Sequence, residues 1–165
     1  MAGKRTELGP TGEAVRVNVR SHRERQNLTY AEVSRRLAAL DRPIPTLGLR
    51  RIEEGARKVD ADDLLALAVV LNIPPIALLM PDAGTSDADV DTTGLGRVQA
   101  REAWAWLRAD QRPMKTGESS RETIAWLSAR PQFAVSAVER GILDDISDGS
   151  HRINEILQRG QDGDD

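Results

Sequence analysis

The chain has 165 residues, of which 39% are apolar, and a formal net charge of −3. It contains no run of about 18 apolar residues, which a membrane-spanning helix requires, and no apolar segment follows its first charges as in a signal peptide. We therefore expect a cytoplasmic protein without a membrane partner. Because there is no cysteine, and the only histidines are the distant His22 and His151, we expect neither a disulfide nor a metal site.

Opposite charges are concentrated in the two halves of the chain. Residues 1–59 carry 13 Lys or Arg against 7 Asp or Glu, whereas residues 82–165 carry 10 against 16. A basic first module is compatible with a polyanionic partner, and an acidic second module with a protein partner. Chance drift in composition is the alternative interpretation.

The first 81 residues contain the start and stop signals of five short helices. After residues 1–10, which we expect to form a flexible arm, the first helix opens at Thr11, a suitable N-cap. In the second, Thr29 and Glu32 have the spacing of a capping box. The prolines of the segment DRPIP end this helix, because a residue before proline is disfavoured in the helical conformation.

Three further helices follow the same logic. The third runs from about Thr46 to Gly55, a common C-terminal stop. The fourth starts after Asp60, which we expect to cap it, and the fifth, IALLM, follows Pro75. Residues 11–81 are therefore predicted to form one helical domain.

The remainder of the chain divides into a linker and a second helical region. Residues 82–96, DAGTSDADVDTTGLG, hold four aspartates and no basic residue, which predicts a flexible acidic linker. Residues 97–160 show helical periodicity again, with Trp104 and Leu107 on one face. Because no alternating pattern of useful length indicates a strand, we predict an all-α protein, with a five-helix domain followed by a second small helical region.

The segment LGLRRIEEGARK, residues 47–58, combines an apolar and a cationic face. On a helix, Leu49 and Ile52 share one side, whereas Arg50 and Arg51 project away from it. In the major groove of DNA, an arginine can form two hydrogen bonds to guanine. The alternative is that both arginines are merely solvated and pair with the two glutamates of the same segment.

Residues 11–81 resemble the lambda-repressor-like, or Xre/Cro, family of helix-turn-helix transcriptional regulators. The resemblance rests on LTYAEVSRRL, LGLRRIEEG and VDADDLLALAVVLNIPPIALL, and above all on the pattern Leu-x-x-Ile-Glu-x-Gly. In this chain the turn AALDRPIP is longer than the family's usual glycine-containing turn, and Pro45 stands where the family commonly has a capping Ser or Thr. The exact start of the recognition helix therefore stays open.

The resemblance implies which residues meet DNA. Those that would read bases are Thr46, Leu47, Arg50 and Arg51. Those that would bind phosphate are Thr29, Tyr30, Arg57 and Lys58. The resemblance also implies a structural ion pair between Arg23 and Glu53, which would neutralise an acid close to the phosphates.

The sequence therefore predicts a sequence-specific DNA-binding transcriptional regulator, more specifically a repressor that binds a palindromic operator in double-stranded DNA as a homodimer. We expect residues 97–160 to provide the dimer contact. The alternative is an antitoxin, whose acidic half binds a partner protein while its first half autoregulates the operon.

An enzyme that uses a helix-turn-helix domain for targeting is the third interpretation. It would need a catalytic cluster in residues 97–160, and the sequence has no nucleophile elbow, phosphate-binding glycine loop or histidine–acid arrangement. We therefore expect no enzymatic activity and no cofactor. The sequence identifies neither the operator nor a small-molecule effector.

Overall fold

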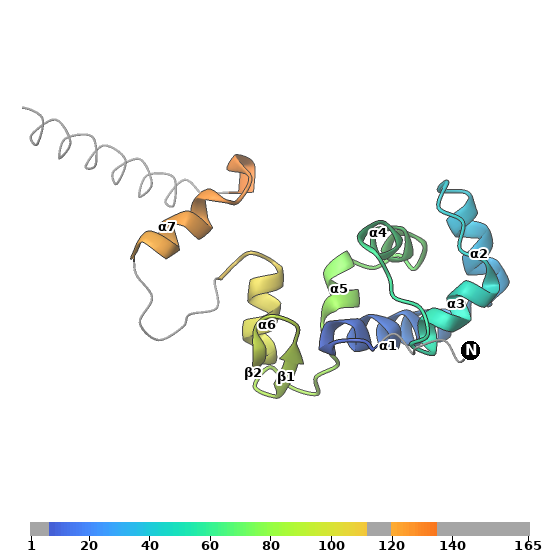
Figure 1. Ribbon diagram of the computed structural model, residues 1–165, viewed down its shortest axis with the longest axis horizontal. Helices are drawn as coiled ribbons and strands as arrows, with labels where there is room; N and C mark the ends of the chain where they lie inside the picture. Colours follow the sequence, from blue (N-terminus) through green and yellow to red (C-terminus); the bar gives the residue numbers. More distant parts are fainter. Residues whose placement is uncertain (1–6, 112–119, 135–165) are drawn as a thin grey trace, which may run out of the picture. The chain divides into compact units, whose positions relative to one another are not determined.

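The computed structural model describes residues 7–111 and 120–134 (Figure 1). The chain forms two compact units, residues 1–113 and 114–165. The described helices of the first unit are α1 Pro10–Arg25, α2 Tyr30–Ala38, α3 Thr46–Glu53, α4 Ala61–Val70, α5 Pro75–Leu79 and α6 Ala100–Leu107. Those of the second are α7 Ser120–Ser128 and the short 3₁₀ turn η1 Gln132–Ala134. No helix in these described ranges is both long enough and apolar enough to cross a membrane.

The helix starts follow local capping chemistry. Thr29 Oγ1 accepts a hydrogen bond from the Glu32 amide at 3.1 Å, and an oxygen of Asp60 accepts one from the Asp63 amide at 2.7 Å. Thr11 is not the cap of α1: Gly9 occupies the N-cap position without a side-chain hydrogen bond, and the helix begins at Pro10, whose φ angle suits a first helical residue. Each of these three starts is therefore determined by residues next to it in the sequence.

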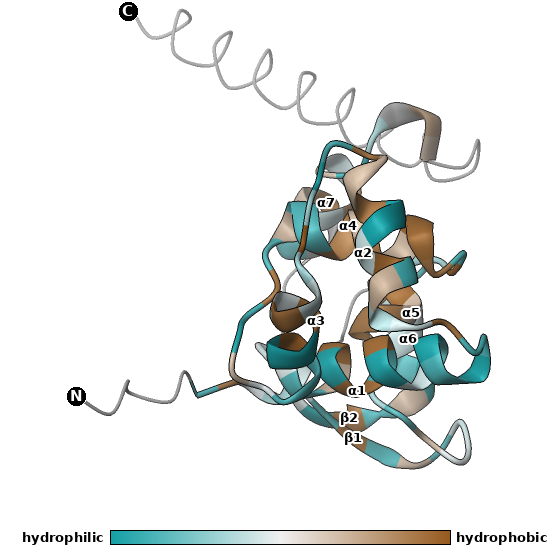
Figure 2. Cartoon of the chain, turned by 90° about the vertical axis from the view of Figure 1, so that its right-hand side faces the viewer, coloured by the Kyte–Doolittle hydropathy of each residue, from teal (hydrophilic) through white to brown (hydrophobic). Residues whose placement is uncertain are grey.

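The core of the first unit is formed by residues of helices α1 to α5 and of the turn before α3. Its fully buried side chains are Val19, Val33, Leu37, Ile44, Leu49, Ile52, Leu67, Leu71 and Leu78. Burying one such side chain stabilises a fold by about 1.5–3 kcal/mol. Figure 2 shows brown and teal segments alternating along the helices of this unit, as expected of helices with one apolar and one polar face.

The lengthened turn before α3 is fixed by one of these core residues. Ile44 is buried although it lies between two prolines, and its backbone carbonyl accepts a hydrogen bond from Ser34 Oγ at 2.7 Å. Pro45 occupies the N-cap position, and α3 starts at Thr46. The extra residues of the turn are thus anchored to α2 and to the core.

The prediction of an all-α fold is wrong, because the first unit also contains an antiparallel two-stranded sheet. Strands β1 (Asp89–Thr92) and β2 (Gly96–Gln99) pair with Val90 opposite Val98, and β1 lies inside the expected acidic linker. Gly94 and Gly96 have positive φ angles of 93° and 75°, as the connecting turn requires.

A small second core explains why this hairpin forms. Val90, Ala100 and Ala103 are buried together, so that α6 covers one face of the hairpin. The hairpin also contacts the start of α1, where the amide of Thr93 donates to Thr11 Oγ1 at 3.0 Å and the amide of Thr11 donates to Thr93 Oγ1 at 3.3 Å. The segment after α5 is therefore an ordered part of the first unit.

The second unit is described only over 120–134. Helix α7 holds Trp126, and the guanidinium carbon of Arg130 lies 5.1 Å from the centre of its ring, a cation–π contact. Of the helical region predicted for residues 97–160, residues 112–119 and 135–160 lie outside the described residues.

Candidate nucleic-acid interface

Helix α3 presents two chemically different faces. Leu49 and Ile52 are buried against the core, as the pattern of the sequence indicates. The residues expected to read bases are all exposed: Thr46, Leu47, Arg50 and Arg51. Spacings of three and four residues bring these four side chains onto one surface of the helix.

Leu47 is 57% exposed near the start of α3. A single exposed leucine needs no explanation by itself. Here it stands one helical turn from Arg50 and Arg51, so the surface offers hydrogen-bond donors beside an apolar group. These are the two kinds of group that distinguish guanine and thymine in the major groove.

The arginines of α3 keep their charges available to a ligand. Among the residues that the structure describes, neither the Arg50 nor the Arg51 guanidinium forms an ion pair, and neither donates a hydrogen bond to the carboxylate of Glu53 or Glu54. The guanidinium carbon of Arg50 lies 5.3 Å from the centre of the Tyr30 ring, which orients the side chain without neutralising it. This arrangement differs from the alternative in which the two arginines pair with neighbouring glutamates.

Glu53 is held in a buried hydrogen-bonded cluster. Arg23 Nε donates to its Oε1 at 2.7 Å, Arg23 Nη2 to its Oε2 at 2.9 Å, and the Tyr30 hydroxyl to Oε2 at 2.8 Å. The Glu53 side chain is 4% exposed and that of Arg23 11%. The hydrogen bond to Glu53 raises the pKa of Arg23 above its ordinary value despite the opposing effect of burial. The Arg23–Glu53 pair thus joins α1 to α3, and the acid is neutralised inside the fold.

This cluster changes how Tyr30 could bind phosphate. Burial is the main cause that raises the pKa of the Tyr30 hydroxyl, and the hydrogen bond that this hydroxyl donates to Glu53 raises the pKa further. Because its proton is already donated to Glu53, Tyr30 would reach a phosphate through its backbone amide. The hydroxyl oxygen of Thr29 is likewise occupied as the N-cap acceptor. Together these two residues offer the N-terminal amides of α2, a favourable place for an anion.

The structure assigns Arg57 a different contact from the one that the resemblance implies. Asp63 is 2% exposed and accepts hydrogen bonds from Arg42 Nε at 2.9 Å and Arg57 Nη2 at 2.7 Å. Arg57 also lies so close to Gly48 that a Cβ there would be 2.9 Å from its Nη1. Arg57 therefore joins α3 to the start of α4. Lys58 is exposed and forms no ion pair within the described part of the chain, so its ammonium group is available.

An open surface depression brings the two predicted sets of residues together. It has a volume of about 590 Å³, and its lining residues are Pro45, Leu47, Gly48, Arg51, Ala56, Arg57 and Lys58. Base-reading candidates from α3 thus adjoin the cations that follow it. Sequence reasoning missed Arg42 and Asp63, which fix Arg57 in this depression. The only sequence signal for them is a cation in the lengthened turn and the acid three residues after the Asp60 cap.

Glu32, in the first turn of α2, is paired with Arg35 and Arg36, and it provides a test of these ion pairs. Hydrogen bonds from Arg35 and then from Arg36 lower the pKa of Glu32 from 4.5 to about 2. Because the folded-state pKa is the lower one, the contribution of these bridges to stability is present above pH 4.5 and is lost as the pH falls towards 2. We expect an NMR titration of the Glu32 carboxyl carbon to have its midpoint near 2, and Arg35→Ala to raise that midpoint. A midpoint above 4 in the unchanged chain would contradict the bridges.

Comparison of the chain with protein-family models, with curated proteins and with solved structures found no match. The function of this chain is therefore inferred from its own residues.

Proposed function

We propose that the chain is a sequence-specific DNA-binding transcriptional regulator of the helix-turn-helix type, more specifically a cytoplasmic repressor. The observation that carries the proposal is the exposed face of α3, where Arg50 and Arg51 have no acidic partner among the described residues while Leu49 and Ile52 hold the helix on the core. A helix with this division can lie in the major groove without losing its packing.

The proposed binding mode assigns a task to each group. Arg50 and Arg51 donate to guanine O6 and N7, and Leu47 contacts a thymine methyl group. The N-terminal amides of α2 and the ammonium of Lys58 bind phosphates, which sets the orientation of α3 in the groove. We propose repression because a bound protein needs only to cover a promoter in order to repress it.

We further propose that two copies bind a palindromic operator. A single helix-turn-helix unit buries little DNA surface, and two-fold symmetry doubles the contacts at half-sites about 34 Å apart. Within residues 97–160, we place the main dimer contact in the second unit, where α7 is amphipathic.

Removal of the second unit is expected to abolish the dimer. A chain of residues 1–113 keeps the first compact unit and should sediment as a monomer, whereas the full chain sediments as a dimer. The truncated chain should also lose at least tenfold in operator affinity, because each copy then binds a half-site alone. Sedimentation equilibrium of both chains provides the measurement. A truncated chain that still dimerises would move the contact into the first unit.

Selection of bound fragments from a random DNA pool tests the function itself. The expected result is one enriched motif with two inverted half-sites, separated centre to centre by about 10 base pairs or a multiple of this spacing. Affinity for the enriched motif should exceed that for random DNA by at least about a thousandfold at physiological salt. A pool without enrichment, or equal affinities for motif and random DNA, would refute the proposal.

A further inference from the structure

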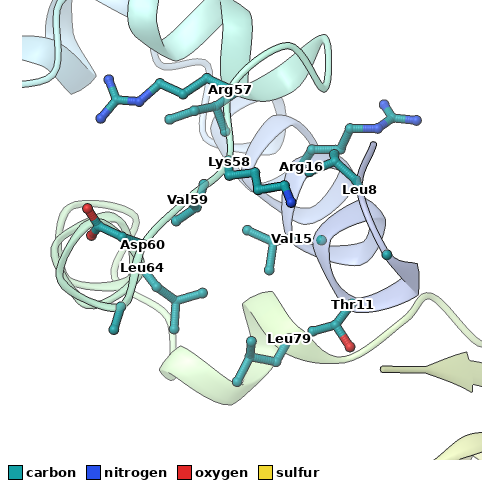
Figure 3. Close-up of a pocket in the computed structure, with 14 residues that line it drawn as sticks. Leu8, Thr11, Val15, Arg16, Arg57, Lys58, Val59, Asp60, Leu64 and Leu79 are labelled. Carbon is teal, nitrogen blue, oxygen red and sulfur yellow. The ribbon is translucent and has the colours of Figure 1, made fainter. Parts of the chain in front are cut away.

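A pocket of about 380 Å³ opens in the first unit and is lined in part by Ile52 of α3 (Figure 3). Its apolar walls are formed by Leu8, Val15, Ile52, Val59, Leu64 and Leu79. These residues come from α1, α3, α4, α5 and the segments beside them, so the pocket lies where the elements of the DNA-binding unit converge. Its volume lies within the range of small-molecule sites, about 300–1,000 Å³.

One cation faces this apolar space. In Figure 3 the side chain of Lys58 extends over the pocket towards α1, whereas the guanidinium groups of Arg16 and Arg57 point away. Lys58 has no ion pair among the residues that the structure describes, so its three N–H donors are available. The mouth of the pocket therefore combines a free ammonium group with apolar walls beneath it.

Asp60 is the acidic residue among those that line the pocket, and its carboxylate is paired outside the apolar space. Asp60 accepts hydrogen bonds from Arg42 Nη2 at 3.0 Å and from the Asp63 amide at 2.7 Å. These bonds hold its carboxylate towards α4 and away from the apolar walls, as Figure 3 shows. They also lower its pKa, the amide of Asp63 being the largest cause, so that Asp60 stays ionised and paired with Arg42.

We infer that this pocket binds an amphipathic monocarboxylate, such as a medium-chain fatty acid. The alkyl chain would replace water against Val15, Leu64 and Leu79, and the carboxylate would accept hydrogen bonds from the Lys58 ammonium. A neutral molecule with the same chain would use the walls but not the cation. The Lys58 ammonium therefore gives the pocket its preference for a ligand with an anionic head group.

Ligand binding and DNA binding share Lys58, which makes them antagonistic. This step rests on the proposed function, in which Lys58 binds a backbone phosphate. An ammonium group held by the ligand's carboxylate is no longer available to the phosphate, so the ligand lowers the affinity for the operator. By linkage, the operator lowers the affinity for the ligand by the same factor.

Calorimetric titration of the full chain with decanoate and with decanol, in the absence of DNA, tests the site. We expect saturable one-to-one binding of decanoate, an affinity about tenfold lower in Lys58→Met, and no effect of that variant on decanol. Arg97→Met, which removes an exposed cation outside the pocket, is the matched control and should leave both affinities unchanged. Absence of saturable decanoate binding, or equal affinities in Lys58→Met, would overturn the inference.

A second variant tests the apolar walls. Ala61 is exposed at the first position of α4 and lines the pocket, so Ala61→Trp should fill it without disturbing the core and abolish binding of both decanoate and decanol. Ala38→Trp, at an exposed alanine at the end of α2, is its control. Circular dichroism establishes that both variants are folded. Unchanged decanoate binding in folded Ala61→Trp would place the ligand elsewhere and overturn the inference.

The antagonism is measured separately, by titration of selected operator DNA with and without saturating decanoate. We expect decanoate to weaken operator binding several-fold in the unchanged chain and to have no effect in Lys58→Met. If decanoate binds but operator affinity does not change, the antagonism is refuted while the pocket and the proposed function both stand. If decanoate binds and no DNA is selected, the proposed function fails and the pocket stands.

Discussion

Replacing Arg23 with alanine is expected to lower the free energy of unfolding by about 3–5 kcal/mol, the cost of breaking a buried ion pair. The loss arises because the carboxylate of Glu53, 4% exposed in its side chain, loses both hydrogen bonds from Arg23 and, among the described residues, retains that from the Tyr30 hydroxyl. The carbonyl of Leu28 also loses its bond from Arg23 Nη1. Chemical denaturation followed by far-ultraviolet circular dichroism measures the change.

Two comparisons separate burial from charge in this experiment. Arg20→Ala removes an arginine that is 62% exposed and paired with Glu24, and should leave the free energy of unfolding nearly unchanged. The double variant Arg23→Met with Glu53→Leu removes the buried charge together with its partner and should recover at least half of the loss. Equal effects of Arg23→Ala and Arg20→Ala would show that the buried pair does not contribute to stability.

The helices could be predicted from the sequence because their signals are local. Thr29 with Glu32 and Asp60 with Asp63 each lie within one turn, and the structure forms the corresponding caps. The hairpin could not be predicted in this way. Its strands have four residues each, and β1 alternates aspartates with only Val90 and Thr92, a pattern too short to distinguish from a polar linker. Its stability depends on α6, which directly follows β2, and on α1, whose Thr11 contacts Thr93 across 82 residues of sequence.

In the candidate site, too, local features could be predicted from the sequence, whereas contacts between distant segments could not. Helical periodicity alone predicts that Leu49 is buried and Arg51 exposed, and both expectations agree with the structure. The pairing of Arg57 with the buried Asp63 depends instead on where the lengthened turn places Arg42 and on the absence of a side chain at Gly48. No local pattern encodes such a contact, since it requires three segments to be packed first.

The position of Arg57 alters which variant tests phosphate binding. Arg57→Ala would leave Asp63 with one fewer charged donor in the interior, so a loss of DNA affinity would be mixed with a loss of stability. Lys58 has no such structural partner among the described residues. Lys58→Ala is therefore the cleaner probe of a phosphate contact, and Arg51→Ala the cleaner probe of base reading.

Arg51→Ala is expected to reduce discrimination between the operator and a variant site by about 1–3 kcal/mol, or roughly 5- to 150-fold, at one base pair of each half-site. The reason is that a bidentate contact with guanine is lost, while the phosphate contacts that act on every sequence remain. Selection from a random DNA pool should then recover a motif that is degenerate at that base pair only. Circular dichroism should show an unchanged fold, because Arg51 is exposed and unpaired within the described chain.

Lys58→Ala provides the opposite signature in the same measurements. It should weaken binding to operator and random DNA equally, and reduce the slope of log affinity against log salt by about 0.9 for each lost phosphate contact. Arg97→Ala, at an exposed arginine of the hairpin, should change neither quantity. If Arg51→Ala lowered all affinities equally and left the selected motif unchanged, Arg51 would be a phosphate contact, and the exposed face of α3 would not be the surface that reads sequence.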